Sequence, residues 1–227
     1  QLFKTLKKVN LQKIRLIILE KPVARSITEL NKIFNYLKKK NLDIIVNYQR
    51  RFDTNYNILK KIIKNNKFGK LQSINVRYSG GVFNIFSHML DLIIMLTNKK
   101  PREVSFTSNN KKSDEFSASG YINFEKNIIC TVNSISQNTH FVFDIYLIFD
   151  KALIDISETN SSLTIYKLKK SKRFDGYKEF YLYKRINNSN CDRLKEMYSH
   201  IEKLLSRKKN VKASGSTLED TKIIIKT

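Results

Sequence analysis

Near its start the chain reads Leu16-Ile17-Ile18-Leu19-Glu20-Lys21-Pro22. The four apolar residues predict a short buried parallel strand, because strands covered on both faces form continuous apolar runs. Pro22 ends this strand and biases Lys21 toward an extended backbone. Open α/β sheets bind their ligands at the carboxyl ends of their strands. We therefore expect Lys21 to project from the sheet edge, as a proton donor or as a fixed charge beside a reacting oxygen.

Two further blocks of sequence follow this turn. The block Asn47-Tyr48-Gln49-Arg50-Arg51-Phe52-Asp53 closes a second apolar strand, and Gly80-Gly81-Val82-Phe83-Asn84-Ile85-Phe86-Ser87-His88-Met89-Leu90-Asp91 opens an apolar helix. Together with the E-K-P turn they resemble the Gfo/Idh/MocA family of NAD(P)-dependent oxidoreductases. That family shows an E-K-P turn, a strand ending in R-F, and a glycine-rich approach to D-x-x-x-H-x-x-D. The resemblance is clear from Leu16 to Asp91 and weaker toward the C-terminus.

The resemblance implies a fold and a domain organisation. The expected class is α/β (α+β), with a remnant of a Rossmann dinucleotide-binding domain over residues 1–42. Residues 43–227 are expected to form an α+β domain for substrate binding and oligomerisation, built on an open, mostly antiparallel sheet. The family's G-x-G-x-x-G turn does not precede the E-K-P strand, since the chain has 6 Gly and none before Gly69. We interpret the chain as one that lacks most of the N-terminal Rossmann domain.

The hydrophobic pattern predicts secondary structure along the whole chain. Apolar residues at helical spacing predict five helices. A sixth helix, from residue 82, is expected from the block that begins at Gly80. Alternating and apolar runs rich in β-branched and aromatic residues predict the strands, with Glu125-Lys126-Asn127 as a hairpin turn. The expected helices are 1–12, 26–40, 53–66, 82–96, 190–206 and one from 216 onward. Asp53 or Thr54 is expected to cap the third helix, and Gly80 and Gly81 to allow a tight entry into the fourth. The fifth is expected to turn inward Leu194, Met197, Ile201, Leu204 and Leu205. The expected strands are 14–19, 43–48, 71–78, 104–108, 116–124, 128–136, 141–149, 152–157, 163–168 and 180–185.

The helix expected from Val82 onward carries a polar stripe. At 3.6 residues per turn, Asn84, Ser87, His88 and Asp91 fall on one narrow face of a helix that is otherwise apolar. Such a stripe must meet a solvated cleft or buried polar partners. One interpretation is a functional cleft. The alternative is a structural network, with His88 bonded to a backbone carbonyl and Asp91 capping a neighbouring segment.

The resemblance assigns roles to these residues. It implies His88 as the acid/base and Lys21 as the group that polarises the same substrate oxygen, in hydride transfer at a sugar hydroxyl. Asn84 stands where the family often has Asp, so it can bond a substrate hydroxyl without carrying charge. The expected ligand contacts are Asn84, Asp91 and Tyr78 for the substrate, and Glu20, Lys21, Pro22 and Arg51 for NAD or NADP. For Arg50 and Arg51 a solvated strand end is an equally open alternative.

Composition limits the remaining possibilities. Hydrophobic content of 41% and charged content of 28% are typical of soluble globular proteins, and the cysteine usage favours a cytoplasmic location. The net charge of +23 suggests nucleic acid, but Lys, Asn and Ile enrichment also follows from an AT-rich coding sequence. Neither a membrane partner nor a metal site is expected. The expected partners are a small sugar substrate and further copies of the chain, joined through the sheet in a dimer or tetramer.

Three functions are therefore open at this stage. The first is a dehydrogenase of a sugar or sugar nucleotide. The second is a non-catalytic remnant or assembly partner that does not bind the cofactor. The third, ranked last, is a basic nucleic-acid-binding module, because the aromatic residues follow apolar strand patterns.

Overall fold

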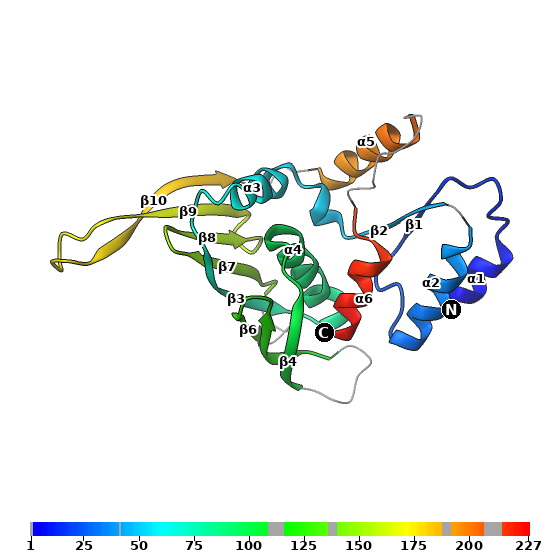
Figure 1. Cartoon of the computed structure of the whole chain (residues 1–227), viewed down its shortest axis with the longest axis horizontal. Helices are drawn as coiled ribbons and strands as arrows, with labels where there is room; N and C mark the ends of the chain where they lie inside the picture. Colours follow the sequence, from blue (N-terminus) through cyan, green and yellow to red (C-terminus); the bar gives the residue numbers. More distant parts are fainter. Residues whose placement is uncertain (1, 41, 109–115, 136–139, 188–191, 207–214) are drawn as a thin grey trace.

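The computed structural model describes residues 2–40, 42–108, 116–135, 140–187, 192–206 and 215–227. Figure 1 shows a large twisted sheet at one end and a small two-stranded unit with its helices at the other. Helices α4 and α6 lie between them. None of the helices in these ranges has the length and hydropathy that a membrane span requires.

The helices follow the expected positions and are mostly shorter at their ends. A 3-10 turn, η1, precedes α3, and a π-helical turn, η2, leads into α4. The bounds are α1 Leu2–Lys8, α2 Ile27–Lys38, η1 Gln49–Phe52, α3 Thr54–Lys64, η2 Val82–Phe86, α4 Ser87–Thr97, α5 Arg193–Ser206 and α6 Leu218–Lys226.

The strands also lie where the apolar runs predicted them. The bounds are β1 Leu16–Leu19, β2 Asp43–Val46, β3 Leu71–Ser79, β4 Pro101–Ser108, β5 Ala118–Phe124, β6 Ile128–Ile135, β7 Phe143–Phe149, β8 Ala152–Ser157, β9 Ser162–Lys170 and β10 Lys178–Asn187. Parts of the expected elements, such as residues 136 and 190–191, lie outside the described residues.

The small unit is a parallel pair of strands covered by helices. β1 and β2 pair from Leu16 opposite Asp43 to Leu19 opposite Val46. On one face α2 buries its apolar stripe, and its first turn is capped by Ser26, which accepts a hydrogen bond from the Glu29 amide. On the other face α5 packs on β2 and η1 through a separate small cluster. This pair spans the expected domain boundary at residue 42, and the division into two domains stays a prediction.

The large sheet has eight strands in the order β10-β9-β8-β7-β3-β6-β5-β4. β3 lies inside it, parallel to β6 and antiparallel to β7, and all other pairs are antiparallel. α4 lies on one face, and every residue from Ser87 to Leu96 is buried. The predicted mixed α/β class with a large, mostly antiparallel sheet is confirmed.

Local details divide between confirmation and correction. The hairpin turn is confirmed, because Lys126 and Asn127 both have positive φ angles, as a two-residue hairpin loop requires. Leu194 and Leu205 were expected to point inward on α5, and this is wrong, since they are 46% and 40% exposed. The reason is that α5 contacts the body only along the narrow line of Met197, Ile201 and Leu204.

Candidate functional site

The E-K-P turn and the polar stripe of the apolar helix meet in space. The Lys21 ammonium group donates hydrogen bonds to the side-chain Oδ1 and to the backbone carbonyl of Asn84, both at 2.8 Å. These residues come from the end of β1 and from η2, which are far apart in the sequence. The Glu20 carboxylate is held by Asn47, whose Nδ2 donates to Oε1 at 2.7 Å. The carboxyl ends of β1 and β2 are thereby tied together beside the start of the site helix.

The glycines before the stripe allow the tight entry that the sequence predicted. Gly80 has φ of 106°, which residues with a Cβ rarely adopt. The chain then makes one π-helical turn, in which the amide of Phe86 bonds the carbonyl of Gly81. π turns are common at functional sites, where they alter the direction of the side chains that follow. Here the turn carries Asn84 and places His88 in the first turn of α4.

His88 is a buried imidazole in a positively charged environment. It is 9% exposed, the ring of Tyr48 packs edge-on against it with centroids 5.2 Å apart, and its Nδ1 has no hydrogen-bond partner within the described ranges. Burial lowers the pKa of His88 to about 2, and the cations Arg50, Lys21 and Arg193 add to this effect. The side chain is therefore neutral at physiological pH. Among the described residues Nδ1 therefore does not make the backbone-carbonyl bond that the structural alternative predicted for His88.

Asp91 and Arg51 form a different, fully internal arrangement. Asp91 is 0% exposed, accepts hydrogen bonds from Nε and Nη2 of Arg51, and accepts another from the Ser216 hydroxyl at 2.9 Å. Arg51 also pairs with Asp220 at 3.1 Å, so the network joins η1, α4 and the start of α6. Burial raises the pKa of the Asp91 carboxyl, and the pairing with Arg51 opposes this effect. The geometry favours a structural role for both residues, and their ligand contacts stay predictions.

A second ion cluster, mostly buried, contains Arg50 and Arg193, two of the cations that act on His88. Glu158, from the turn between β8 and β9, accepts hydrogen bonds from Arg50, from Nη2 of Arg193 at 2.6 Å and from the Tyr56 hydroxyl at 3.0 Å. Arg193 also pairs with Asp53 at 3.0 Å. The cations hold the pKa of the Glu158 carboxyl below its ordinary value despite its burial. The strand end at Arg50 and Arg51 is therefore not solvated, as side-chain exposures of 12% and 8% show.

The remaining predicted site residues are spread over two environments. Glu20, Lys21 and Pro22 line an open pocket at the end of β1, together with residues of α1 and α2. Tyr78 is 0% exposed, and its hydroxyl both donates to and accepts from the backbone of Ala118. The structure thus brings Lys21, Asn84 and His88 together, while the Tyr78 ring packs on Phe86 and its hydroxyl is engaged by Ala118.

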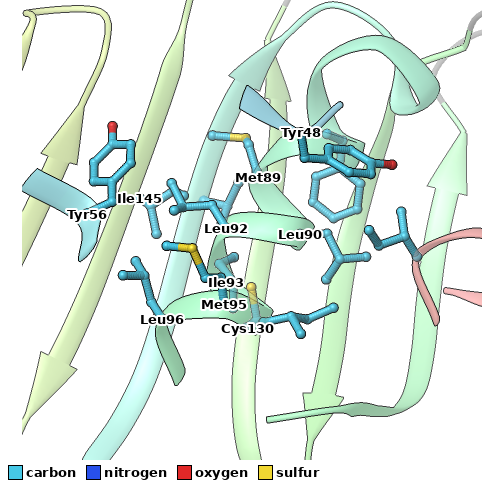
Figure 2. Packing of buried hydrophobic residues seen from close by; sticks show 14 of the residues in the cluster. Tyr48, Tyr56, Met89, Leu90, Leu92, Ile93, Met95, Leu96, Cys130 and Ile145 are labelled. Atoms are coloured by element: carbon cyan, nitrogen blue, oxygen red, sulfur yellow. The ribbon is translucent and has the colours of Figure 1, made fainter. Parts of the chain in front are cut away.

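The helix that carries the site is anchored firmly. Figure 2 shows Met89, Leu92 and Ile93 of α4 within the buried cluster, together with Ile145 of the sheet. Tyr48 stands at the border of this cluster, where it contacts His88. A site built on such a helix is positioned more rigidly than one built on loops.

Sequence reasoning missed Glu158 and Arg193. Both act on His88 or on its neighbour Arg50, yet neither lies in a motif or in a periodic pattern. Ser216, which binds Asp91, and Tyr48, which packs on His88, are further cases where only the fold shows the contact. Within the described ranges, no group of His, Cys, Asp and Glu side chains has the arrangement of a metal site.

The chain contains only some of the groups that usually bind a dinucleotide cofactor. The E-K-P turn is an open strand end of the type that ligands approach. However, the 227 residues contain no G-x-G-x-x-G, whose turn and helix N-terminus cradle the pyrophosphate. Arg51, expected at the cofactor, is occupied by Asp91 and Asp220. Among the residues expected to contact the cofactor, Glu20, Lys21 and Pro22 stay open to a ligand, and Arg51 does not.

Comparison with known proteins gives a structural answer only. A scan of protein-family models and a search of curated proteins each found no match. Among solved structures, the super-repressor mutant of Gal80p from Saccharomyces cerevisiae is similar with a TM-score of 0.76 and 13% identity, over 93% of this chain and 68% of that one. An oxidoreductase from Sinorhizobium meliloti has a TM-score of 0.71 and 10% identity, over 92% and 67% of the two chains.

A third similar structure is an NAD-binding protein from Listeria innocua, with a TM-score of 0.67 and 17% identity, over 92% of this chain and 66% of that one. At such low identities the likeness establishes the fold and does not by itself transfer an activity. The chain therefore has the fold shared by an NAD-binding protein, an oxidoreductase and Gal80p, and its large sheet matches the fold that the Gfo/Idh/MocA resemblance predicted.

Proposed function

We propose that this chain forms the substrate side of an NAD(P)-dependent oxidoreductase that acts on a hydroxyl or carbonyl group of a sugar or sugar nucleotide. The observation that carries this proposal is the convergence of Lys21, Asn84 and His88 at the carboxyl end of β1. The fold supports it, since the same fold occurs in proteins described as NAD-binding or as an oxidoreductase.

His88 and Lys21 would have different roles toward the substrate oxygen. Oxidation of a carbinol removes a hydride from carbon, which a nicotinamide would accept, and a proton from the hydroxyl. His88 is neutral, so its imidazole can receive that proton. The Lys21 ammonium, 2.8 Å from Asn84 Oδ1, would hold the oxygen as negative charge develops on it.

The low pKa of His88 has a chemical consequence. An ideal general base has a pKa near the working pH, so a pKa of about 2 makes His88 a weak base before the substrate binds. An alkoxide developing beside the ring would raise this pKa, because an opposite charge favours the imidazolium. Asn84, which is neutral, does not supply such a charge itself.

The open face of the large sheet supports assembly of several copies. Strand register places six residues in one row across the sheet, one from each of β10, β9, β8, β7, β3 and β6. In that order they are Leu182, Tyr166, Leu153, Ile148, Ser73 and Ile129. Leu182 and Ile129 are 57% and 51% exposed, and Tyr121 beside them is 40% exposed. Exposed apolar surface of this kind marks interaction sites. We propose a homodimer or tetramer through this face, in a cytoplasmic enzyme.

The alternative is a non-catalytic protein. Two observations favour it: a similar structure belongs to Gal80p, described as a super-repressor mutant, and Arg51, expected at the cofactor, is held by Asp91 and Asp220. An assembly or regulatory partner would retain the fold and the buried ion networks without turnover. Tight, steeply salt-dependent binding of nucleic acid would instead support the third function.

The test uses the natural full-length gene product. It is incubated with NAD⁺ or NADP⁺ and a panel of monosaccharides and nucleotide sugars, while reduced nicotinamide is followed by absorbance. Saturable reduction with one sugar class supports the proposal. Absence of turnover, together with absence of thermal stabilisation by either dinucleotide, would favour the non-catalytic alternative.

A further inference from the structure

A partly open, mostly apolar cavity of about 240 Å³ lies beside the Pro22 turn and the start of the site helix. Its walls come from the Pro22 turn, from η2 and the first turns of α4, from β4 and β5, and from α6. Pro22, Phe83 and Ser87 line it, and these are the chain neighbours of Lys21, Asn84 and His88. Lys21, Asn84 and His88 are thus each one peptide bond from a residue of the cavity wall.

The wall of this cavity excludes polar and charged occupants. Five aromatic rings line it, from Tyr48, Phe83, Phe86, Phe106 and Phe116, and none of the lining side chains carries a charge or an amide group. A charged ligand would meet no side-chain counter-charge, and desolvating it there would be unfavourable.

The few hydroxyl groups in the wall are already used by the protein. The hydroxyls of Ser87, Thr221 and Thr227 donate to backbone carbonyls four residues earlier, at 2.7, 3.0 and 2.9 Å. The Tyr48 hydroxyl is hydrogen-bonded with Ser87. A sugar placed here would leave most of its hydroxyls without partners, which is costly in a buried site. The cavity is therefore distinct in chemistry from the polar stripe at His88.

The size of the cavity indicates what it would hold. Apolar cavities of about 150 Å³ stay dry and accept benzene, since water gains too few hydrogen bonds in them. A cavity of 240 Å³ accommodates a larger ring system, such as an indole. We infer that this cavity binds an uncharged, apolar, ring-sized group, and that its occupancy adjusts the neighbouring side chains Lys21, Asn84 and His88.

Tyr48 provides the physical link between cavity and site. Tyr48 lines the cavity, and its ring makes a T-shaped contact with the His88 ring at an interplanar angle of 83°. A ligand in the cavity would restrict the Tyr48 ring and thereby the imidazole. The binding step does not depend on the proposed oxidoreductase function, and only an effect on turnover would.

The probe is indole, with glucose as the polar comparison, and the readouts are titration calorimetry and NMR signals of the Ala118 methyl and the His88 ring. Ala118 lines the cavity, so Ala118→Leu would fill part of it. We expect saturable binding of indole that moves both signals, and a loss of about tenfold or more in Ala118→Leu. Val104→Leu, an exposed position on β4, is the matched control and should bind like the natural chain.

Several results would overturn the inference. Indole that fails to saturate, or binds equally to Ala118→Leu, excludes the cavity as its site, and glucose moving the Ala118 signal excludes an apolar ligand. If Ala118→Leu does not fold, Phe106→Leu replaces it, because the enlarged cavity should then prefer a naphthalene-sized ring to indole. The apolar group could belong to the substrate or to a separate small molecule, and phenyl glucoside distinguishes the two. If phenyl glucoside binds and moves both NMR signals, the group is a substituent of the substrate. If indole binds and phenyl glucoside does not, the ligand is a separate small molecule.

Discussion

Replacing Arg51 with Met would test the view that Arg51 and Asp91 are structural. The substitution removes the two guanidinium nitrogens that bind Asp91 and leaves a carboxylate with 0% exposure and one remaining hydrogen bond, from Ser216. Breaking a buried pair in this way costs about 3 to 5 kcal/mol. The contact with Asp220 contributes less, because the Asp220 side chain is 23% exposed.

The loss of stability should depend on pH with a defined sign. Burial raises the pKa of Asp91 and the pairing with Arg51 opposes this, so removing Arg51 raises the folded-state pKa of Asp91 in the variant further above its unfolded value. A carboxyl whose pKa is raised by folding makes the protein less stable as the pH rises above the unfolded pKa of about 3.9. We therefore expect a larger difference from the natural chain at about pH 8 than at about pH 5.

The assay is urea unfolding followed by circular dichroism at both pH values. Arg102→Met, on the exposed side of β4, is the matched control and should change the free energy of unfolding by less than about 0.5 kcal/mol. Adding Asp91→Asn to Arg51→Met should remove the pH dependence. A loss below about 1 kcal/mol that is equal at both pH values would refute the reasoning.

Three further perturbations probe the site and the sheet. Asn84→Asp places a carboxylate one helical turn from His88 and should raise the pKa of His88 by roughly one unit, measured by NMR titration; an unchanged value would show that the two side chains are not coupled. Glu158→Gln should destabilise the chain at neutral pH, and because the pKa of Glu158 lies below its unfolded value of about 4.3, the variant should also lose less stability than the natural chain on acidification; equal acid sensitivity in urea titrations would contradict this. Gly120→Ala introduces a Cβ that overlaps the backbone of β4, so thermal unfolding should show a loss of about 1 to 3 kcal/mol, and a neutral result would place the two strands farther apart.

The fold was largely predictable because local patterns carried it. Apolar runs marked almost every strand, and Asp53, expected as a helix cap, accepts hydrogen bonds from the amides of Asn55 and Tyr56. The convergence of Lys21 with the His88 helix followed from the motif resemblance, and no local pattern would have predicted it. The inward direction of Leu194 and Leu205 was wrong because a helical pattern does not reveal how narrow the covering surface is.

The rest of the site depends on long-range contacts. Glu158 reaches Arg50 and Arg193 from a turn in the large sheet, and a turn residue shows no periodicity from which this could be inferred. Ser216 and Asp220 meet Arg51 and Asp91 only because α6 returns to the site helix. The low pKa of His88 likewise depends on the fold, which buries the ring and gathers cations around it.

The most direct test of the central claim is the activity of His88→Asn in the natural full-length protein. Turnover of the best sugar with its preferred dinucleotide is compared with that of the natural protein and of Lys21→Ala, with circular dichroism to verify folding. Loss of a general acid/base typically lowers kcat by about 10² to 10⁴. We expect a loss of that order in His88→Asn with little change in dinucleotide binding. Retained turnover in a folded His88→Asn protein would contradict the assignment of His88 and Lys21 as the groups that act on the substrate oxygen.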